Sequence, residues 1–313
     1  GDIYGSTSNP DWSAGQVLGP WLMYKYYGDK RILETFYPSA KKEVDHCTAS
    51  AAGTNYWSGS FGDWCPPFTD GTYENSFSEG EVVNTALYHY ITGLLSEMAG
   101  ILGKAGDSIK YAARADSIKI AFNEKLFNSS TNKYGSGKQI TYIMPLLSGV
   151  VPENRKSQVV ENLVKNVSVE GSGHFGSGIY GTSFLADLLC DYGHADAALT
   201  LFTRNTYPSF GDQILNHDAT TTWEQWGTIK TGREMQTYDH AMFSGADKTF
   251  YTRFGGIIPA TPGYKTIIIK PNIPQGLEYV KSSVRTVHGL VISDWGKSGR
   301  LFKHHINIPV NTS

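Results

Sequence analysis

The clearest helical stretch of the chain is residues 83–103, VNTALYHYITGLLSEMAGILG. Its apolar side chains recur every three or four positions and form one broad face, made of Val83, Leu87, Tyr90, Ile91, Leu94, Met98, Ile101 and Leu102. Gly103 is a typical helix end. Asp107 is expected to cap a partner helix that runs to about Leu126. Because only a few residues link the two helices, they should be antiparallel neighbours.

The same rhythm of paired helices recurs from about residue 13 to residue 255. Helices are expected at 14–27, 30–50, 139–148, 182–191 and 195–203, after Pro152, and after a cap at Asp239. Pro38 should break or kink the second of these. A closed ring of helical hairpins is the natural architecture for so many paired helices. The loops at one end of such a ring would form a concave site.

The pattern changes after Gly255. Short runs separated by turn residues predict β-strands at 265–271, 279–287, 290–295 and 301–309. This segment is too short for a self-sufficient β-sandwich, so it should pack on the helical part or be an incomplete domain. We therefore expect a barrel of helical hairpins over residues 1–256 and a β-rich segment over residues 257–313.

Composition excludes several classes of partner. The formal charge of −2 gives no reason to expect a nucleic acid or an anionic membrane surface. No apolar run approaches the roughly 20 residues that span a bilayer. The three cysteines lack metal-ligand spacing, and no phosphate-loop or metal motif is present, so neither a metal nor a cofactor is expected. The oligomeric state stays open, and a secreted or periplasmic location is favoured over a cytoplasmic one.

The stretch Thr220-Thr221-Thr222-Trp223-Glu224-Gln225-Trp226 places one carboxylate between two indoles. The threonine run favours extended backbone, in which Glu224 and Trp226 would share a face. A carboxylate beside an indole is shielded from water, which suits it to proton transfer. Indoles also offer sugar rings a flat apolar surface. The alternative, a surface glutamate near two core tryptophans, is equally compatible with composition.

Three other segments carry candidate site residues. Asp11 and Trp12 lie in the loop 9–15, which also has the features of a turn and helix start. Asp63 and Trp64 lie between Gly and Pro in residues 61–67, where no regular periodicity explains them. His240 begins a predicted helix, a position where histidine is more often a structural hydrogen-bonding group. A Gly-rich stretch at 171–182 has no phosphate-loop pattern and predicts close backbone approach.

Carboxylates and tryptophans in loops of a helical ring favour glycoside hydrolysis. Several segments then match a known family in its own order: Pro10-Asp11-Trp12, Pro20-Trp21, Gly62-Asp63-Trp64, Gly181-Thr182-Ser183-Phe184-Leu185, Thr206-Tyr207-Pro208-Ser209, Thr221-Thr222-Trp223-Glu224-Gln225-Trp226, His240-Ala241-Met242-Phe243 and Pro262-Gly263-Tyr264. On these segments, which cover nearly the whole chain, it resembles the catalytic domain of α-L-rhamnosidases of glycoside hydrolase family 78.

The resemblance implies a mainly α fold, an (α/α)6 toroid that is incomplete at the N-terminus, followed by a partial C-terminal β-sandwich segment. It implies removal of terminal α-L-rhamnose from a glycoside or polysaccharide, with inversion at the anomeric carbon. Glu224 matches the general base. Trp12, Trp64 and His240 match residues that line the rhamnose pocket, and the neighbouring motif positions add the acidic residues and the last tryptophan of the stretch as substrate-binding candidates, namely Asp11, Asp63 and Trp226.

One departure from the family pattern concerns the general acid. The family has a glutamate in an Asp-Xaa-Xaa-Xaa-Arg-Asp-Glu motif upstream of the Pro-Asp-Trp segment, and no such motif precedes Asp11. We therefore expect a chain that begins inside the barrel and stops inside the β-domain, with poor activity by itself. Two alternatives remain: a non-catalytic carbohydrate-binding protein, and another toroidal inverting glycosidase that acts on glucosides or uronides.

Overall fold

The structure is a computed structural model that describes residues 9–57, 61–67, 77–227 and 237–313. It divides into two compact units. The first contains Gly1–Trp21, Lys30–Asn166 and Gly176–Gly181, and the second contains Leu22–Asp29, Val167–Phe175 and Thr182–Ser313. Among the described residues, no helix is long and apolar enough to cross a membrane. The chain is mainly helical, with small antiparallel sheets toward its C-terminal end, as expected.

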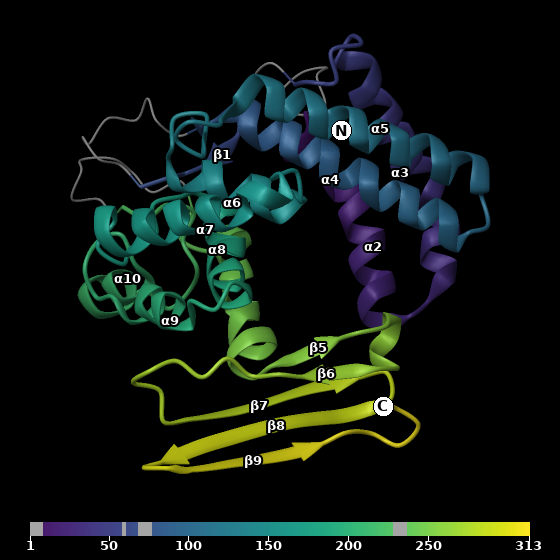
Figure 1. The fold of residues 1–313 in the computed structure, drawn as a ribbon. Helices are drawn as coiled ribbons and strands as arrows, with labels where there is room; N and C mark the ends of the chain where they lie inside the picture. The colour runs from purple at the N-terminus through teal and green to yellow at the C-terminus, as the bar shows by residue number, and fades with distance from the viewer. Residues whose placement is uncertain (1–8, 58–60, 68–76, 228–236) are drawn as a thin grey trace. The chain divides into compact units, whose positions relative to one another are not determined.

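The predicted helical pair forms the centre of the first unit. Helix α4 (Gly80–Ile101) and helix α5 (Ala105–Leu126) pack along their length (Figure 1). Most of the predicted apolar face of α4 is buried, since α5 and neighbouring helices cover it, and only Tyr90, Ile101 and Leu102 are partly exposed. The predicted cap is wrong: Lys104 precedes α5, and Asp107 lies in its first turn. There Asp107 accepts a hydrogen bond from the Tyr37 hydroxyl at 2.8 Å, so its carboxylate ties α5 to another helix.

The described part of this unit contains four more whole helices. They are α1 (Pro10–Ser13), α3 (Lys30–Ser50), α6 (Gln139–Ser148) and α7 (Lys156–Lys165), and α2 (Gly15–Tyr27) begins in it. Helices α1, α3 and α6 each pack on α4, and α7 packs on α6. Helix α3 continues through Pro38, so the predicted break is absent. Leu33 before the proline and Val44 after it are both fully buried, which holds the two halves of α3 against the core.

Short elements link these helices. They are β1 (Asp63–Trp64) with β2 (Phe77–Ser78), β3 (Phe127–Asn128) with β4 (Lys133–Tyr134), and the turns η2 (Glu153–Arg155) and η3 (Asn166–Glu170).

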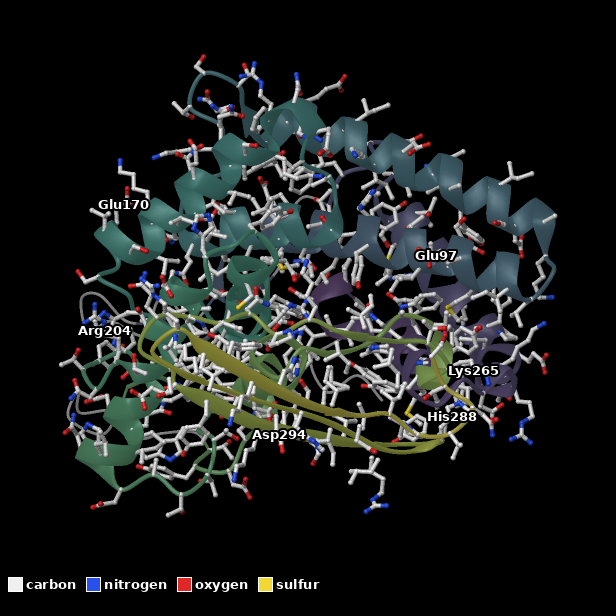
Figure 2. The ribbon with its side chains drawn as sticks, turned by 60° about the horizontal axis from the view of Figure 1, so that its bottom comes forward. Glu97, Glu170, Arg204, Lys265, His288 and Asp294 are labelled. Carbon is white, nitrogen blue, oxygen red and sulfur yellow. The ribbon has the colours of Figure 1, made fainter. Side chains whose placement is uncertain are left out.

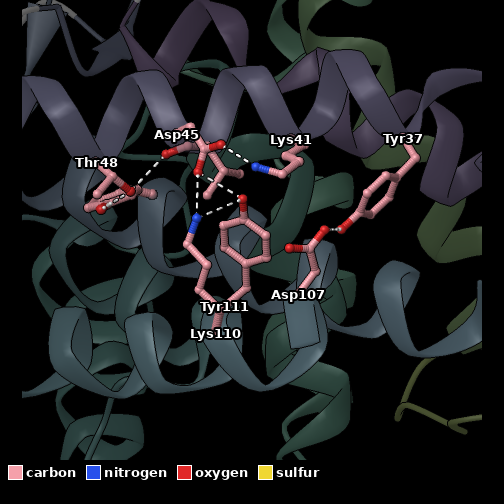
Figure 3. Close-up of polar contacts among 9 residues, drawn as sticks. Tyr37, Lys41, Asp45, Thr48, Asp107, Lys110 and Tyr111 are labelled. Atoms are coloured by element: carbon pink, nitrogen blue, oxygen red, sulfur yellow. Dashed lines mark hydrogen bonds and ion pairs between the residues drawn. The ribbon is translucent and has the colours of Figure 1, made fainter. Parts of the chain in front are cut away.

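A polar network joins α3 to α5 (Figure 3). The carboxylate of Asp45 accepts hydrogen bonds from Lys41 at 2.6 Å and from the Tyr111 hydroxyl at 2.8 Å, and it pairs with Lys110 at 3.3 Å. Burial acts to raise the pKa of Asp45, but these donors outweigh it, so the pKa is lowered. The network therefore favours the ionised carboxylate.

The second unit contains the remaining helices. They are α8 (Ile179–Asp191), which begins in the first unit, α9 (Ala195–Thr203), α10 (Phe210–His217), η5 (Ala241–Asp247) and η6 (Phe250–Phe254). The periodicity of the sequence did not predict α10, which Ser209 caps by accepting a hydrogen bond from the Asp212 amide at 3.0 Å. The last predicted cap is also wrong, because His240 and not Asp239 caps η5.

The predicted strands form in the C-terminal part of the second unit. Strand β5 (Ile257–Pro259) pairs with β6 (Ile267–Ile269), with η7 (Pro262–Tyr264) between them, and β7 (Tyr279–Thr286), β8 (Gly289–Ser298) and β9 (Leu301–Asn307) form an antiparallel meander. Figure 2 looks onto this meander, with Asp294 on β8 and His288 in the preceding turn. Its inner face packs on β5 through Val291 and Ile257, both fully buried.

Candidate active site

Asp11 is fixed by three hydrogen bonds inside the first unit. Its amide donates to the Asn84 side-chain oxygen at 2.8 Å, and its Oδ2 accepts from the Gly62 amide at 2.7 Å and from Asn84 Nδ2 at 3.0 Å. Burial raises the pKa of Asp11 against the opposing effect of these bonds. Its other oxygen, Oδ1, has no hydrogen-bond partner within the described ranges. Asp11 is thus held rigidly with one carboxyl oxygen unused.

Trp12, the next residue, has the opposite environment. Its side chain is 63% exposed, and its ring meets Phe61 edge-on with centroids 6.4 Å apart. The fixed backbone of α1 therefore presents a flat indole to solvent. An exposed indole beside a buried carboxylate has the chemical features of a sugar-binding surface.

Asp63 is fully buried in strand β1. Its Oδ2 accepts a hydrogen bond from the Gly178 amide at 2.6 Å, and its Oδ1 accepts from the amides of Tyr180 at 3.0 Å and Gly181 at 3.5 Å. These amides belong to the start of α8, where backbone N–H groups lack helical partners. Burial raises the pKa of Asp63 to about 7 despite these donors. The geometry gives this carboxylate a helix-capping role, and direct contact with substrate stays a prediction.

The segment 176–181 connects the two candidate loops of the first unit. The hydroxyl of Tyr180 donates a hydrogen bond to the backbone carbonyl of Asp11. A Cβ at position 178 would lie 1.8 Å from the carbonyl oxygen of Trp64, so only glycine allows this approach. Close backbone approach was the predicted role of the Gly-rich stretch, and here it is confirmed. Asp11, Trp12, Asp63 and Trp64 are thus brought together in one unit.

Glu224 lies in the second unit and is 7% exposed. Its amide donates to the Thr237 carbonyl at 3.1 Å, and the Thr237 hydroxyl donates to its Oε2 at 2.7 Å. The amide of His240 donates to the Thr222 carbonyl at 2.8 Å, so residues 222–224 lie beside residues 237–240. Glu224 and His240 are therefore brought together. The expected extended backbone does not continue through residues 224–226, which form bends, and the backbone of residues 222–224 bonds to residues 237–240.

His240 uses one ring nitrogen structurally, and the residue is half-buried. Its Nδ1 accepts a hydrogen bond from the Met242 amide at 3.3 Å and so caps η5. When Nδ1 accepts, the ring proton lies on Nε2, which makes that nitrogen a donor. The structural reading of this histidine is therefore right, and it leaves Nε2 with the correct polarity to donate to a sugar hydroxyl.

Trp226 is a core residue in this structure. It is 1% exposed, and its ring stacks on Phe175 and Phe243 with centroids 5.2 and 4.6 Å away. Trp223 is similarly buried and is 5% exposed. Because the Trp226 ring has almost no exposed surface, the structure gives no support for its contact with sugar, which stays a prediction. Its packing anchors the end of the segment that carries Glu224.

Some residues of these two clusters were not singled out from the sequence. They are Asn84, Tyr180 and Thr237, which hold Asp11 and Glu224 in place. A single asparagine within a helix, or a single threonine outside one, gives no local signal of its distant partner. Tyr180 lay within the Gly-rich stretch, but its partner is 169 residues away.

Comparison with known proteins gives a consistent family. Residues 3–254 match the model of the bacterial alpha-L-rhamnosidase 6 hairpin glycosidase domain, and residues 256–313 match the bacterial alpha-L-rhamnosidase C-terminal domain. An alpha-L-rhamnosidase of Formosa agariphila is 28% identical over 307 residues, covering 96% of this chain and 33% of that protein. An alpha-L-rhamnosidase of Alteromonas sp. is 27% identical over 311 residues, which cover 96% of this chain and 34% of that protein.

Solved structures give the same result. The alpha-L-rhamnosidase of Dictyoglumus thermophilum superimposes with a TM-score of 0.89 at 33% identity, covering 99% of this chain and 34% of that one. The Streptomyces avermitilis enzyme complexed with L-rhamnose also superimposes with a TM-score of 0.89. Its sequence identity is 25%, and the match covers 99% of this chain and 30% of that one. The chain spans about a third of the length of these relatives. By its match over residues 3–254, the chain belongs to the bacterial α-L-rhamnosidase six-hairpin glycosidase family.

Proposed function

We propose that this chain carries the base side of an inverting α-L-rhamnosidase site, which removes terminal α-L-rhamnose from a glycoside or polysaccharide. The observation that carries the proposal is Glu224, a carboxylate that is almost fully buried and oriented by the Thr237 hydroxyl at 2.7 Å. Family membership and the named relatives support rhamnose as the sugar.

The proposed chemistry uses one carboxylate oxygen of Glu224 for orientation and the other for proton transfer. Oε2 accepts the Thr237 hydrogen bond, which fixes the plane of the carboxylate. Oε1 then accepts a proton from a water molecule as that water attacks the anomeric carbon from the face opposite the leaving group. The product has inverted configuration. His240 donates from Nε2 to a sugar hydroxyl and so orients the ring.

The tryptophans of the first unit have a binding role in this proposal. Trp12 offers an exposed ring, and Trp64 is held in place through the Asp63 hydrogen bonds. Apolar C–H faces of a deoxyhexose pack well against such indoles. Asp11, with its unused Oδ1 buried, can accept a hydrogen bond from a sugar hydroxyl.

Calorimetry with L-rhamnose tests the binding part of this proposal on the chain as it stands. The wild-type chain should bind L-rhamnose, and His240→Ala and Trp64→Ala should each weaken binding by about tenfold. Proton NMR of the sugar first released from an aryl α-L-rhamnoside tests the stereochemistry, which should be β. Release of the α-anomer as first product contradicts inversion. Rhamnose binding without hydrolysis of any activated aryl rhamnoside favours the carbohydrate-binding alternative.

A further inference from the structure

A pocket in the second unit lies where the two matched family domains meet. It has a volume of about 430 Å³, within the roughly 300–1,000 Å³ range of small-molecule sites. The helical side contributes α9, the end of η5, and η6, and the β side contributes β7 and the loop before it. Its lining includes Asp247, Phe250, Tyr251, Phe254, Lys281 and Ser282, none of which belongs to the proposed rhamnosidase site.

Two aromatic side chains at this pocket are unusually exposed. Phe250 is 43% exposed and Tyr251 is 47% exposed, although both belong to the short π-helix η6. Single π-turns of this kind occur frequently at functional sites. Phe250 is held by Phe202 and Phe254, with ring centroids 4.7 and 5.9 Å away. The pocket therefore has a partly exposed aromatic wall, in which ring contacts hold Phe250 in place.

The opposite wall contains a buried hydroxyl group that forms no hydrogen bond with the described residues. Ser282 on β7 is 6% exposed, and its Oγ has no hydrogen-bond partner in the part of the chain that the structure describes. The close approach of η6 to β7 depends on Gly255, since a Cβ there would lie 2.4 Å from Ser282 Oγ. A buried polar atom without a partner is costly and calls for an explanation, and a ligand hydroxyl would supply the missing bond.

The polar groups at the pocket also restrict the charge of a ligand. Asp247 and Lys281 both line it and are exposed, and their opposite charges cancel. A strongly anionic or cationic ligand gains little from such a pair. A purely apolar ligand would leave Ser282 unsatisfied. A sugar ring has apolar C–H faces for the aromatic wall and hydroxyl groups for Ser282 and Asp247.

We propose that the pocket between η6 and β7 binds a neutral saccharide, separately from the site that contains Glu224. Its sugar ring stacks on Tyr251 and Phe250 and exchanges a hydrogen bond with Ser282 Oγ. Such a site would hold a second sugar unit of a glycan on the same chain. The residues of this pocket are distinct from those of the Glu224 site, so the pocket proposal does not depend on the rhamnosidase proposal.

Calorimetric titration with methyl α-L-rhamnoside tests the pocket. The wild-type chain should bind two equivalents, and Tyr251→Ala should weaken one of the two events by about tenfold, the effect of losing one stacked ring. Tyr27→Ala is the matched control, because Tyr27 is 56% exposed and does not line the pocket. Ser282→Ala should weaken the same event while thermal unfolding stays unchanged or rises, since the hydroxyl has no partner in the described fold.

The outcomes separate the two proposals. If Tyr251→Ala and Ser282→Ala leave both binding events intact, the pocket proposal is overturned. Tighter binding of a simple phenol than of the rhamnoside, abolished by Tyr251→Ala, also overturns it in favour of an aromatic ligand. Trp64→Ala should weaken only the other event, by about tenfold. If that variant changes nothing while Tyr251→Ala acts as expected, the rhamnosidase site is refuted and the pocket is retained.

Discussion

The carboxylate of Asp63 accepts a hydrogen bond from the backbone amide of Gly178 across 115 residues of sequence, at 2.6 Å. The bond joins the strand that carries Trp64 to the first turn of α8. Because Tyr180 in the same turn donates to the carbonyl of Asp11, one short segment orients both candidate sugar-binding loops of the first unit. Residues that touch no sugar can therefore control how Trp12 and Trp64 are presented.

Asp63→Asn should destabilise the protein although the two side chains have the same shape. Both carboxylate oxygens accept N–H bonds, so an amide must turn its NH2 group toward a backbone donor. The cost should be about 1–3 kcal/mol, measured by urea unfolding. An unchanged midpoint would show that the carboxylate does not cap α8.

The effect of Asp63→Asn should also depend on pH. The folded-state pKa of Asp63 is raised to about 7, above its unfolded value of roughly 3.9, so the folded state binds more protons in this window. The contribution of Asp63 to stability is then fully present below about pH 4 and is lost as pH rises toward 7. The difference between wild type and variant should shrink over that range, and a difference that grows would contradict the raised pKa.

Gly178→Ala should destabilise the first unit by about 3 kcal/mol, because the added methyl meets the Trp64 carbonyl and not a flexible side chain. Gly93→Ala in α4 is the matched control. Within the described ranges, no atom beyond the local helix backbone lies within 4 Å of a Cβ at position 93, so this change should stabilise the helix by up to about 1 kcal/mol. Equal effects of the two substitutions would remove the argument for a required glycine.

Trp226→Ala and Trp12→Ala should separate a core indole from an exposed one. Trp226 is stacked among phenylalanines, and its loss should cost about 3–5 kcal/mol in the free energy of unfolding. Trp12 is 63% exposed, so its loss should cost less than about 1 kcal/mol while weakening rhamnose binding. A Trp12→Ala chain that binds rhamnose normally would exclude Trp12 from the sugar site.

Asp45→Asn should have a small effect that disappears in acid. The pKa of Asp45 is lowered in the folded state, so its contribution is present above the unfolded pKa near 3.9 and is lost as pH falls through the lower folded value. Since the carboxylate is 38% exposed, the cost at pH 7 should stay below about 1 kcal/mol. Unfolding curves at pH 7 and pH 3 measure the difference, and a cost that persists unchanged at pH 3 would contradict an electrostatic origin.

The sequence predicted the local elements well where one apolar face determines them. Helices α6 and α9 have the predicted bounds, because periodicity and turn residues are local signals. The predicted caps at Asp107 and Asp239 were wrong. Asp107 bonds to Tyr37, a distant partner that local sequence does not indicate, and the neighbouring His240 takes the capping position of η5. Two tryptophans with equally suggestive neighbours, Trp12 and Trp226, have opposite environments, and only tertiary packing decides which is exposed.

Turnover of a dinitrophenyl α-L-rhamnoside by Glu224→Ala, with and without azide, tests the central claim most directly. This leaving group departs without protonation, so the assay depends on the base and not on a general acid. Relative to wild type, the variant should lose about 10²–10⁴-fold in rate. Azide, which needs no base to attack, should restore turnover and yield the β-rhamnosyl azide. Undiminished hydrolysis by Glu224→Ala, or an azide product of retained α configuration, would contradict the assignment of Glu224 as the inverting base.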